Sequence, residues 1–138
     1  MRLSINQKNT AGHYLDLKYQ NLENSIEVDV LTVDEYFSKD DILINFIKMD
    51  VEGAESNVIQ GMNKVLKNSK NLKMIVEYNP MAINQIGLNP KKYLNLLTEN
   101  NFNLFDINEQ TKSIRKTNSE DLLNKYENLY TNLFCHKI

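Results

Sequence analysis

The sequence predicts an α/β fold with a mainly parallel sheet, helical crossovers and a β-rich N-terminal segment. The first 30 residues alternate between apolar and polar side chains in several short runs, which is typical of strands with one solvent-facing side. Residues 44–49 and 72–78 are mostly apolar and resemble strands buried on both faces. Segments with helical spacing follow each run, and this alternation indicates parallel strands joined by crossovers.

Composition limits the classes of protein that the chain can belong to. Its 138 residues are enough for one domain with a real core. With 18 acidic and 16 basic residues, the formal charge of −2 gives no electrostatic case for nucleic acid. No apolar run is long enough for a membrane span, the N-terminal residues lack the apolar core of a signal peptide, and the single Cys135 excludes an internal disulfide. We therefore expect a cytoplasmic protein with no nucleic-acid or membrane partner.

The N-terminal third is expected to form short strands and one short helix. The alternating runs that predict strands are residues 2–5, 13–17 and 25–30, with a polar loop at 6–12. Thr32 and Glu35 have the spacing of a capping box, which predicts a short helix through Tyr36 or Phe37. A polar turn over residues 39–41 then leads into the strand at 44–49.

The rest of the chain alternates between helices and strands. A helix is expected from Ala54 to about residue 66, and Gly61 predicts a kink or two short helices there. Asn89 and Pro90 predict the start of the next helix. The remaining expected elements are a strand at 103–107, a short pairing segment at 113–115, a helix at 119–126 and a last, antiparallel strand at 129–138.

Carboxylates follow both of the apolar strands. Asp50, Glu52 and Glu55 come directly after residues 44–49, while Glu77 ends the second strand and Asn79 follows it. Because ligands bind outside the carboxyl ends of strands in open α/β sheets, these side chains are expected to share one crevice. They could hold a hard cation or act as a general base. The alternative is that acids such as Glu55 simply favour the first turn of a helix.

The same residues resemble a known family. Residues 47–55 (IKMDVEGAE), followed by Val58, Ile59 and Gly61, are similar to the KIDVEGAE signature of FkbM-type methyltransferases, with Met49 in place of the usual isoleucine. The likeness extends to residues 28–36 (VDVLTVDEY), 9–15 (NTAGHYL) and 75–77 (IVE), and it weakens after about residue 97.

This resemblance implies a Rossmann-like fold and methyl transfer from S-adenosylmethionine to a hydroxyl group of a small molecule or glycan, such as a sugar or secondary metabolite. By the same resemblance, Asp50 would lie at the lip of the cofactor pocket, where it would position the acceptor or act as base, and His13 is the alternative base. The remaining implied roles are cofactor binding for Asp50 and Gly53, and substrate binding for Glu52, Glu55, Glu77 and Asn79.

A glycine-rich turn for the cofactor is not found in the sequence, because no two of its glycines (Gly12, Gly53, Gly61 and Gly87) lie within a turn of each other. We therefore expect residues 1–138 to be one truncated domain, with the cofactor half supplied by a longer parent chain, a partner or a homo-oligomer. Residues 44–49 would then be an unpaired, aggregation-prone edge. Two alternatives are a non-catalytic subunit that binds a partner at this edge, and a metal-dependent hydrolase that uses Asp50, Glu52 and Glu77.

Overall fold

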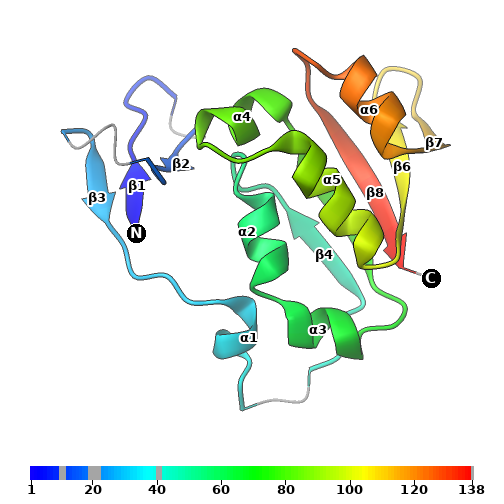
Figure 1. Cartoon of the computed structure of the whole chain (residues 1–138), viewed down its shortest axis with the longest axis horizontal. Coiled ribbons are helices and arrows are strands. Elements are labelled where there is room, and N and C mark those ends of the chain that lie inside the picture. Colours follow the sequence, from blue (N-terminus) through cyan, green and yellow to red (C-terminus); the bar gives the residue numbers. More distant parts are fainter. Residues whose placement is uncertain (10–11, 19–22, 40–41, 138) are drawn as a thin grey trace.

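The computed structural model describes residues 1–9, 12–18, 23–39 and 42–137 of the chain (Figure 1). In these residues the strands are β1 (Arg2–Ser4), β2 (Tyr14–Leu15), β3 (Ser25–Glu27), β4 (Phe46–Met49), β5 (Lys73–Tyr78), β6 (Phe102–Asn108), β7 (Ser113–Thr117) and β8 (Thr131–Lys137). The helices are α1 (Val33–Tyr36), α2 (Glu55–Gln60), α3 (Asn63–Asn68), α4 (Pro80–Gln85), α5 (Pro90–Glu99) and α6 (Ser119–Lys125).

The N-terminal strands form a small antiparallel sheet in the order β2-β1-β3, which confirms the predicted β-rich segment. Leu3 pairs with Leu15 on one side and with Ile26 on the other. The strands are shorter than the sequence predicts. In the loop expected at 6–12, residues 10 and 11 lie outside the described part of the chain.

The link between the two sheets is fixed by helix caps. Thr32 Oγ1 accepts from the Glu35 amide at 3.0 Å, and Glu35 Oε2 accepts from the Thr32 amide at 2.7 Å, so the predicted capping box is confirmed. The Asp34 carboxylate accepts from the amides of Lys64 and Val65 and joins α1 to the start of α3. In the polar turn expected at 39–41, residues 40 and 41 are not described.

The main sheet, in the part of the chain described here, has the order β4-β5-β8-β6-β7. Only β4 and β5 pair in parallel, so the prediction of a mainly parallel sheet is wrong. The crossovers do give β4, β5 and β6 one direction, as expected. The crossover from β5 to β6, however, leaves a gap one strand wide, and β8 fills it antiparallel to both neighbours. β7 adds a hairpin beyond β6.

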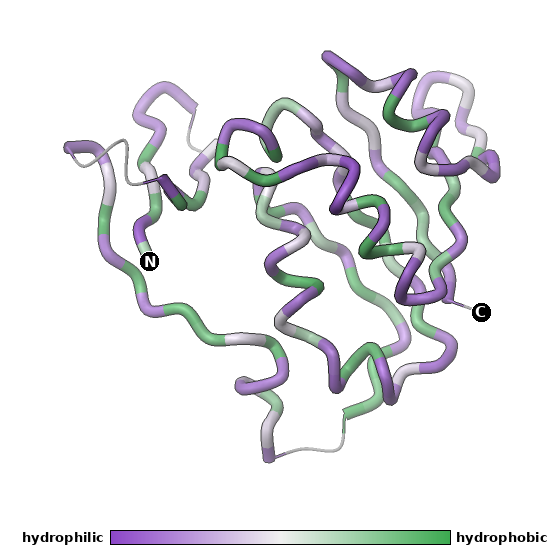
Figure 2. The backbone as a smooth tube through the Cα atoms, viewed as in Figure 1, coloured by the Kyte–Doolittle hydropathy of each residue, from purple (hydrophilic) through white to green (hydrophobic). Residues whose placement is uncertain are grey.

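The helices α2, α3, α5 and α6 lie over one face of the main sheet (Figure 1), and hydrophobic residues concentrate along the strands and the helix sides that face them (Figure 2). Met74, Val76 and Tyr78 point into this core and are fully buried. On the opposite face Phe105 and Phe134 have ring centroids 5.8 Å apart. β4 lies at the edge of the sheet, where Phe46 is 53% exposed, so the predicted apolar edge is confirmed for the described strands.

Two details of the helices follow from single residues. Gly61 separates α2 from α3, and a Cβ there would lie 3.2 Å from the Cβ of Thr32, so the glycine also lets the α1 cap approach closely. The helix α4 is not among the predicted elements. It begins directly after β5, where Asn79 Oδ1 accepts from the Ala82 amide and Pro80 occupies the first turn.

Candidate active site

The turn from β4 into α2 has a constrained backbone. Glu52 and Gly53 both have positive φ angles, of 50° and 93°. The first is uncommon for a side chain other than glycine. A Cβ on Gly53 would lie 2.6 Å from the carbonyl carbon of Ala82, so only glycine lets this turn press against α4. The two residues reverse the chain so that the acids stand at the carboxyl end of β4.

The side chain of Glu55 is buried in the β4–α2 turn and hydrogen bonds with its backbone. Its side chain is 1% exposed, and Oε1 accepts from the Val51 amide at 3.1 Å. Burial raises the pKa of Glu55, and hydrogen bonds from the backbone of Glu55, Val51 and Gly53 oppose the change. Oε2 is buried without a partner. Glu55 does not line the cleft described below, and its visible contacts match the alternative of an acid that stabilises a helix start.

Asp50 lies close to solvent. Its carboxylate forms an ion pair with Lys48 Nζ at 3.1 Å, and both side chains are about half exposed. The neighbouring Glu52 has a raised pKa because of partial burial, with a smaller contribution from the Asp50 charge. Lys48 was not predicted as part of the site, although its position two residues before Asp50 on a strand places both side chains on one face.

Glu77 is the most perturbed acid of the group. It stands at the carboxyl end of β5, next to β4, and its Oε2 is buried without a partner. Burial raises the pKa of Glu77 to about 7, and the charges of Asp50, Glu52 and Glu55 add to this, while a hydrogen bond with Asn79 opposes it. The charges of the acids at the ends of the two strands therefore interact, but Glu77 does not line the cleft that Asp50 and Glu52 share, so the expectation of one shared crevice is not met for it.

An open cleft of about 640 Å³ separates the small sheet from the β4–α2 turn. It brings His13 together with Asp50 and Glu52, while Glu77 and Asn79 do not line it. His13 Nδ1 accepts from the Asn6 amide at 3.0 Å, so in the neutral ring the proton is on Nε2. His13 lines the cleft, and its other ring nitrogen can therefore donate a hydrogen bond. Residues 10 and 11 of its loop are not described.

Two tyrosines beside Glu77 were not predicted. The hydroxyl of Tyr93 donates to the Glu77 carbonyl oxygen at 3.2 Å, and the hydroxyl of Tyr78 is buried without a partner. Burial raises the pKa of Tyr78 to about 12. Alternation along β5 could have placed Tyr78 on the helix-covered face, but nothing in the sequence indicates that its hydroxyl lacks a partner.

The described residues give no support to the hydrolase alternative. Among them, no group of three or more His, Cys, Asp or Glu side chains is arranged to hold a metal ion. No helix in this part of the chain is long and apolar enough to cross a membrane.

Comparison with known proteins identifies the family. The model of the methyltransferase FkbM domain matches residues 2–104, which include the four acids at the ends of β4 and β5 and the residues that line the cleft. Comparisons with curated proteins and with solved structures found no match. The matched region is about three quarters of the chain and contains the residues that carry the resemblance. The chain belongs to the FkbM methyltransferase family.

Proposed function

We propose that this chain takes part in methyl transfer from S-adenosylmethionine to a hydroxyl group of a small molecule or glycan. The observation that carries the proposal is the buried, unpartnered carboxylate oxygen of Glu77 beside three other acids. It lies at the carboxyl end of β5, the region where open α/β sheets bind ligands. In a chain of a methyltransferase family, such a carboxylate can act as the general base that accepts the proton of the acceptor hydroxyl.

The acidic cleft is a reasonable fit for a cationic cofactor. Asp50 and Glu52 place negative charge along a wall of the cleft, which favours a positively charged group electrostatically. When bound, S-adenosylmethionine would supply an electrophilic methyl group. Gly53 was expected to contact the cofactor. Instead, the space where its side chain would lie is filled by the backbone of Ala82, so this glycine allows the turn to pack against α4. We propose that a longer parent chain or a partner chain supplies the remaining cofactor contacts.

Glu77 is better suited to accept the acceptor's proton than the two candidates chosen from the sequence. A general base works best when its pKa is near the operating pH, and that of Glu77 is about 7. Asp50 is already paired with Lys48, and the free nitrogen of His13 carries a proton. We therefore assign Asp50 to positioning the reactants, His13 to donating a hydrogen bond to the acceptor, and Glu77 to taking up its proton.

A second candidate function is a partner-binding subunit of the same fold. The observation that favours it is the unpaired edge of β4, where Phe46 is 53% exposed. Another strand could extend the sheet there, either from a missing half or from a second copy of the chain. The two functions are compatible when the bound partner completes the cofactor site.

Thermal melts with and without S-adenosylmethionine test the proposal. Ligand at 100 times its dissociation constant should stabilise a binding-competent fold by about 2.7 kcal/mol, a rise of several degrees in melting temperature. We expect this rise for the chain alone or together with the longer chain or partner proposed above, and a loss of methyl transfer in Glu77→Gln without loss of the rise. If neither the chain alone nor the chain with its proposed partner shows a rise, the methyltransferase proposal fails.

A further inference from the structure

A second hollow, of about 300 Å³, lies at the end of the main sheet where β5 and β6 finish and β8 begins. Its lining is mostly polar and comes from the β6–β7 turn, the end of α6 and the loop into β8: Ile107, Asn108, Glu109, Gln110, Lys125, Tyr126, Tyr130, Thr131 and Asn132. All of these residues follow residue 104, where the family match ends. The matched region thus carries the acidic cleft, and the unmatched region builds this polar hollow.

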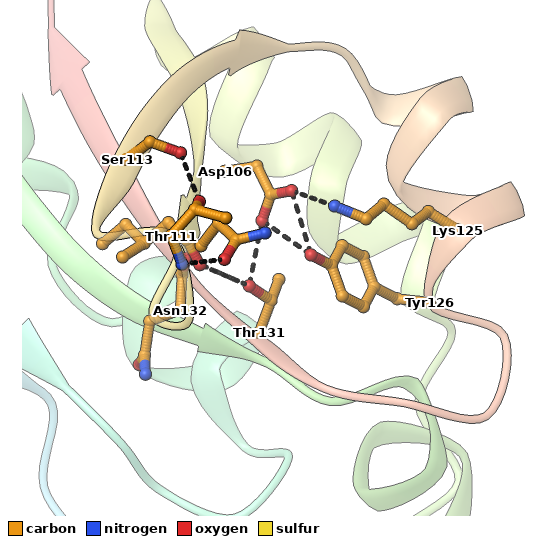
Figure 3. A network of polar contacts seen from close by, with 9 residues as sticks. Asp106, Thr111, Ser113, Lys125, Tyr126, Thr131 and Asn132 are labelled. Carbon is orange, nitrogen blue, oxygen red and sulfur yellow. Dashed lines mark hydrogen bonds and ion pairs between the residues drawn. The ribbon is translucent and has the colours of Figure 1, made fainter.

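The wall of the hollow is held in place by Asp106 (Figure 3). This carboxylate, only 9% exposed, accepts from Lys125 Nζ at 2.6 Å, from the Tyr126 hydroxyl at 2.8 Å and from Thr131 Oγ1 at 2.9 Å. These bonds tie the end of α6 to β6 and β8. The ring of Tyr126 also packs edge-on against Tyr78, with centroids 6.5 Å apart. The hollow is therefore preformed, and its cation is already paired.

The groups that remain for a ligand are amides, a carboxylate and an aromatic ring. Asn132 Nδ2 donates to Glu109 Oε1 at 3.1 Å, which leaves the amide oxygen of Asn132 and the second carboxylate oxygen of Glu109 for other donors. Tyr130 is 62% exposed and presents its ring at the rim. Hydroxyl groups suit such amides and carboxylates, and an aromatic face suits the apolar C–H face of a pyranose ring. Glu109 disfavours anionic ligands such as phosphates.

The hollow is adjacent to Glu77 through the sheet register. Asn132 on β8 lies directly opposite Glu77 on β5. Directly opposite residues have Cβ atoms about 4.5–5.5 Å apart and project from the same face. A molecule whose hydroxyl reaches Glu77 would therefore extend across one strand spacing into the hollow.

We propose that this hollow is an acceptor-recognition subsite that binds a neutral glycan unit next to the sugar that receives the methyl group. The proposal rests on the proposed function and gives it a substrate class, a neutral oligosaccharide of at least two units. Because its residues lie outside the family match, the subsite would determine which acceptor this chain selects, while the acids of the matched region carry the shared chemistry.

The test compares Tyr130→Ala with Leu129→Ala in the full chain. Leu129 is a matched control because it is 61% exposed on the same loop but does not line the hollow. The probes are maltose, cellobiose, lactose and trehalose, together with the methyl glycosides of their monosaccharides. We expect at least one disaccharide to shift the amide NMR signals of residues 108–110 and 130–132. Tyr130→Ala should weaken its binding about tenfold, and Leu129→Ala by less than about twofold.

Shifts confined to the acidic cleft, equal binding by the two variants, or no binding of any disaccharide would each overturn the subsite. Labelled methyl transfer, assayed with the same disaccharides and S-adenosylmethionine, separates this result from the proposed function. Binding at residues 130–132 without any transfer by the parent protein would contradict the function and leave the subsite intact. Methyl transfer with equal rates and equal KM in Tyr130→Ala and Leu129→Ala would support the function and contradict the subsite.

Discussion

Replacing Glu77 by glutamine should make the protein more stable at alkaline pH. The carboxyl of Glu77 has a pKa of about 7 in the fold, compared with 4.5 for an ordinary glutamate, and burial is the main cause. A raised pKa means that the folded state binds the proton more strongly than the unfolded chain. The stability contributed by this proton is therefore fully present below pH 4.5 and is lost as the pH rises through 7. Glutamine keeps the shape of the protonated side chain and cannot lose that proton.

The size of the effect follows from the difference in pKa between the two states. Each pKa unit corresponds to about 1.36 kcal/mol, so the change from 4.5 to about 7 gives an upper limit of about 3.4 kcal/mol. Glu77 is only partly buried, and water screens such a group, so we expect about 1–2 kcal/mol at pH 8.5. The repulsion from Asp50, Glu52 and Glu55 is already part of this pKa shift and adds nothing further to the limit.

Urea unfolding between pH 4 and pH 8.5 measures this difference directly. Wild type and Glu77→Gln should have similar free energies of unfolding at pH 4, and the variant should be more stable by about 1–2 kcal/mol at pH 8.5. Glu99→Gln, at the exposed end of α5, serves as the control and should follow wild type throughout. A carbon-13 titration of the Glu77 carboxyl gives an independent reading. A carboxyl that titrates near pH 4.5, or a variant that is less stable at pH 8.5, would refute the reasoning.

Two further substitutions test the framework around the candidate sites. Gly53→Ala should lower the free energy of unfolding by about 2–4 kcal/mol because its Cβ would meet the backbone of Ala82 at 2.6 Å. Gly61→Ala is the control and should lower it by less than about 1 kcal/mol. Equal losses of stability in thermal melts of the two variants would contradict this prediction. Burial raises the pKa of Asp106, but hydrogen bonds from Lys125 and its neighbours outweigh burial and hold this pKa below the usual 3.8, so its stabilisation is present above pH 3.8 and is lost on acidification. Asp106→Asn should therefore cost about 1–3 kcal/mol at pH 7, with a smaller difference from wild type at pH 3, and an unchanged difference in urea melts would argue against the network.

Local signals in the sequence predicted local structure well. The capping box at Thr32, the break at Gly61 and the helix start at Asn89 depend on residues within one turn of each other, and all three are present. The missed helix α4 is also a local error. An asparagine followed by a proline, as at Asn79 and Pro80, also predicts a helix start, and this signal was not used there.

Strand order could not be predicted because it depends on contacts between distant parts of the chain. The crossovers correctly gave β4, β5 and β6 a common direction, but they do not specify neighbours. β8 is the last strand in the sequence, and it lies between β5 and β6 because its Leu133 and Cys135 fill the core there. Alternation in residues 129–138 predicted the strand, and the hairpin-like polar stretch before it predicted the antiparallel direction, although Ile138 itself lies outside the described residues.

The sequence predicts the positions of the candidate residues, whereas the roles that the resemblance implies depend on contacts that it does not indicate. Asp50, Glu52 and Glu77 follow or end two parallel neighbouring strands, so they lie at the same end of the sheet. Their roles depend on partners that the spacing does not indicate. Lys48 pairs with Asp50, and the Asn6 amide fixes the proton of His13 on the other ring nitrogen. Glu77 has no such contact at its Oε2, which is buried without a partner, as is Oε2 of Glu55.

The arrangement of buried polar atoms supports the proposal that a ligand binds where β4 and β5 end. In the described residues, the buried side-chain atoms without a hydrogen-bond partner are Glu55 Oε2, Glu77 Oε2 and the Tyr78 hydroxyl. All three lie where β4 and β5 end, and each such atom costs about 1–3 kcal/mol. Elsewhere the fold avoids this cost, as the several bonds to Asp106 illustrate. Under the proposed function, an acceptor hydroxyl that donates to Glu77 would regain part of this energy on binding, and this gain would favour the bound state.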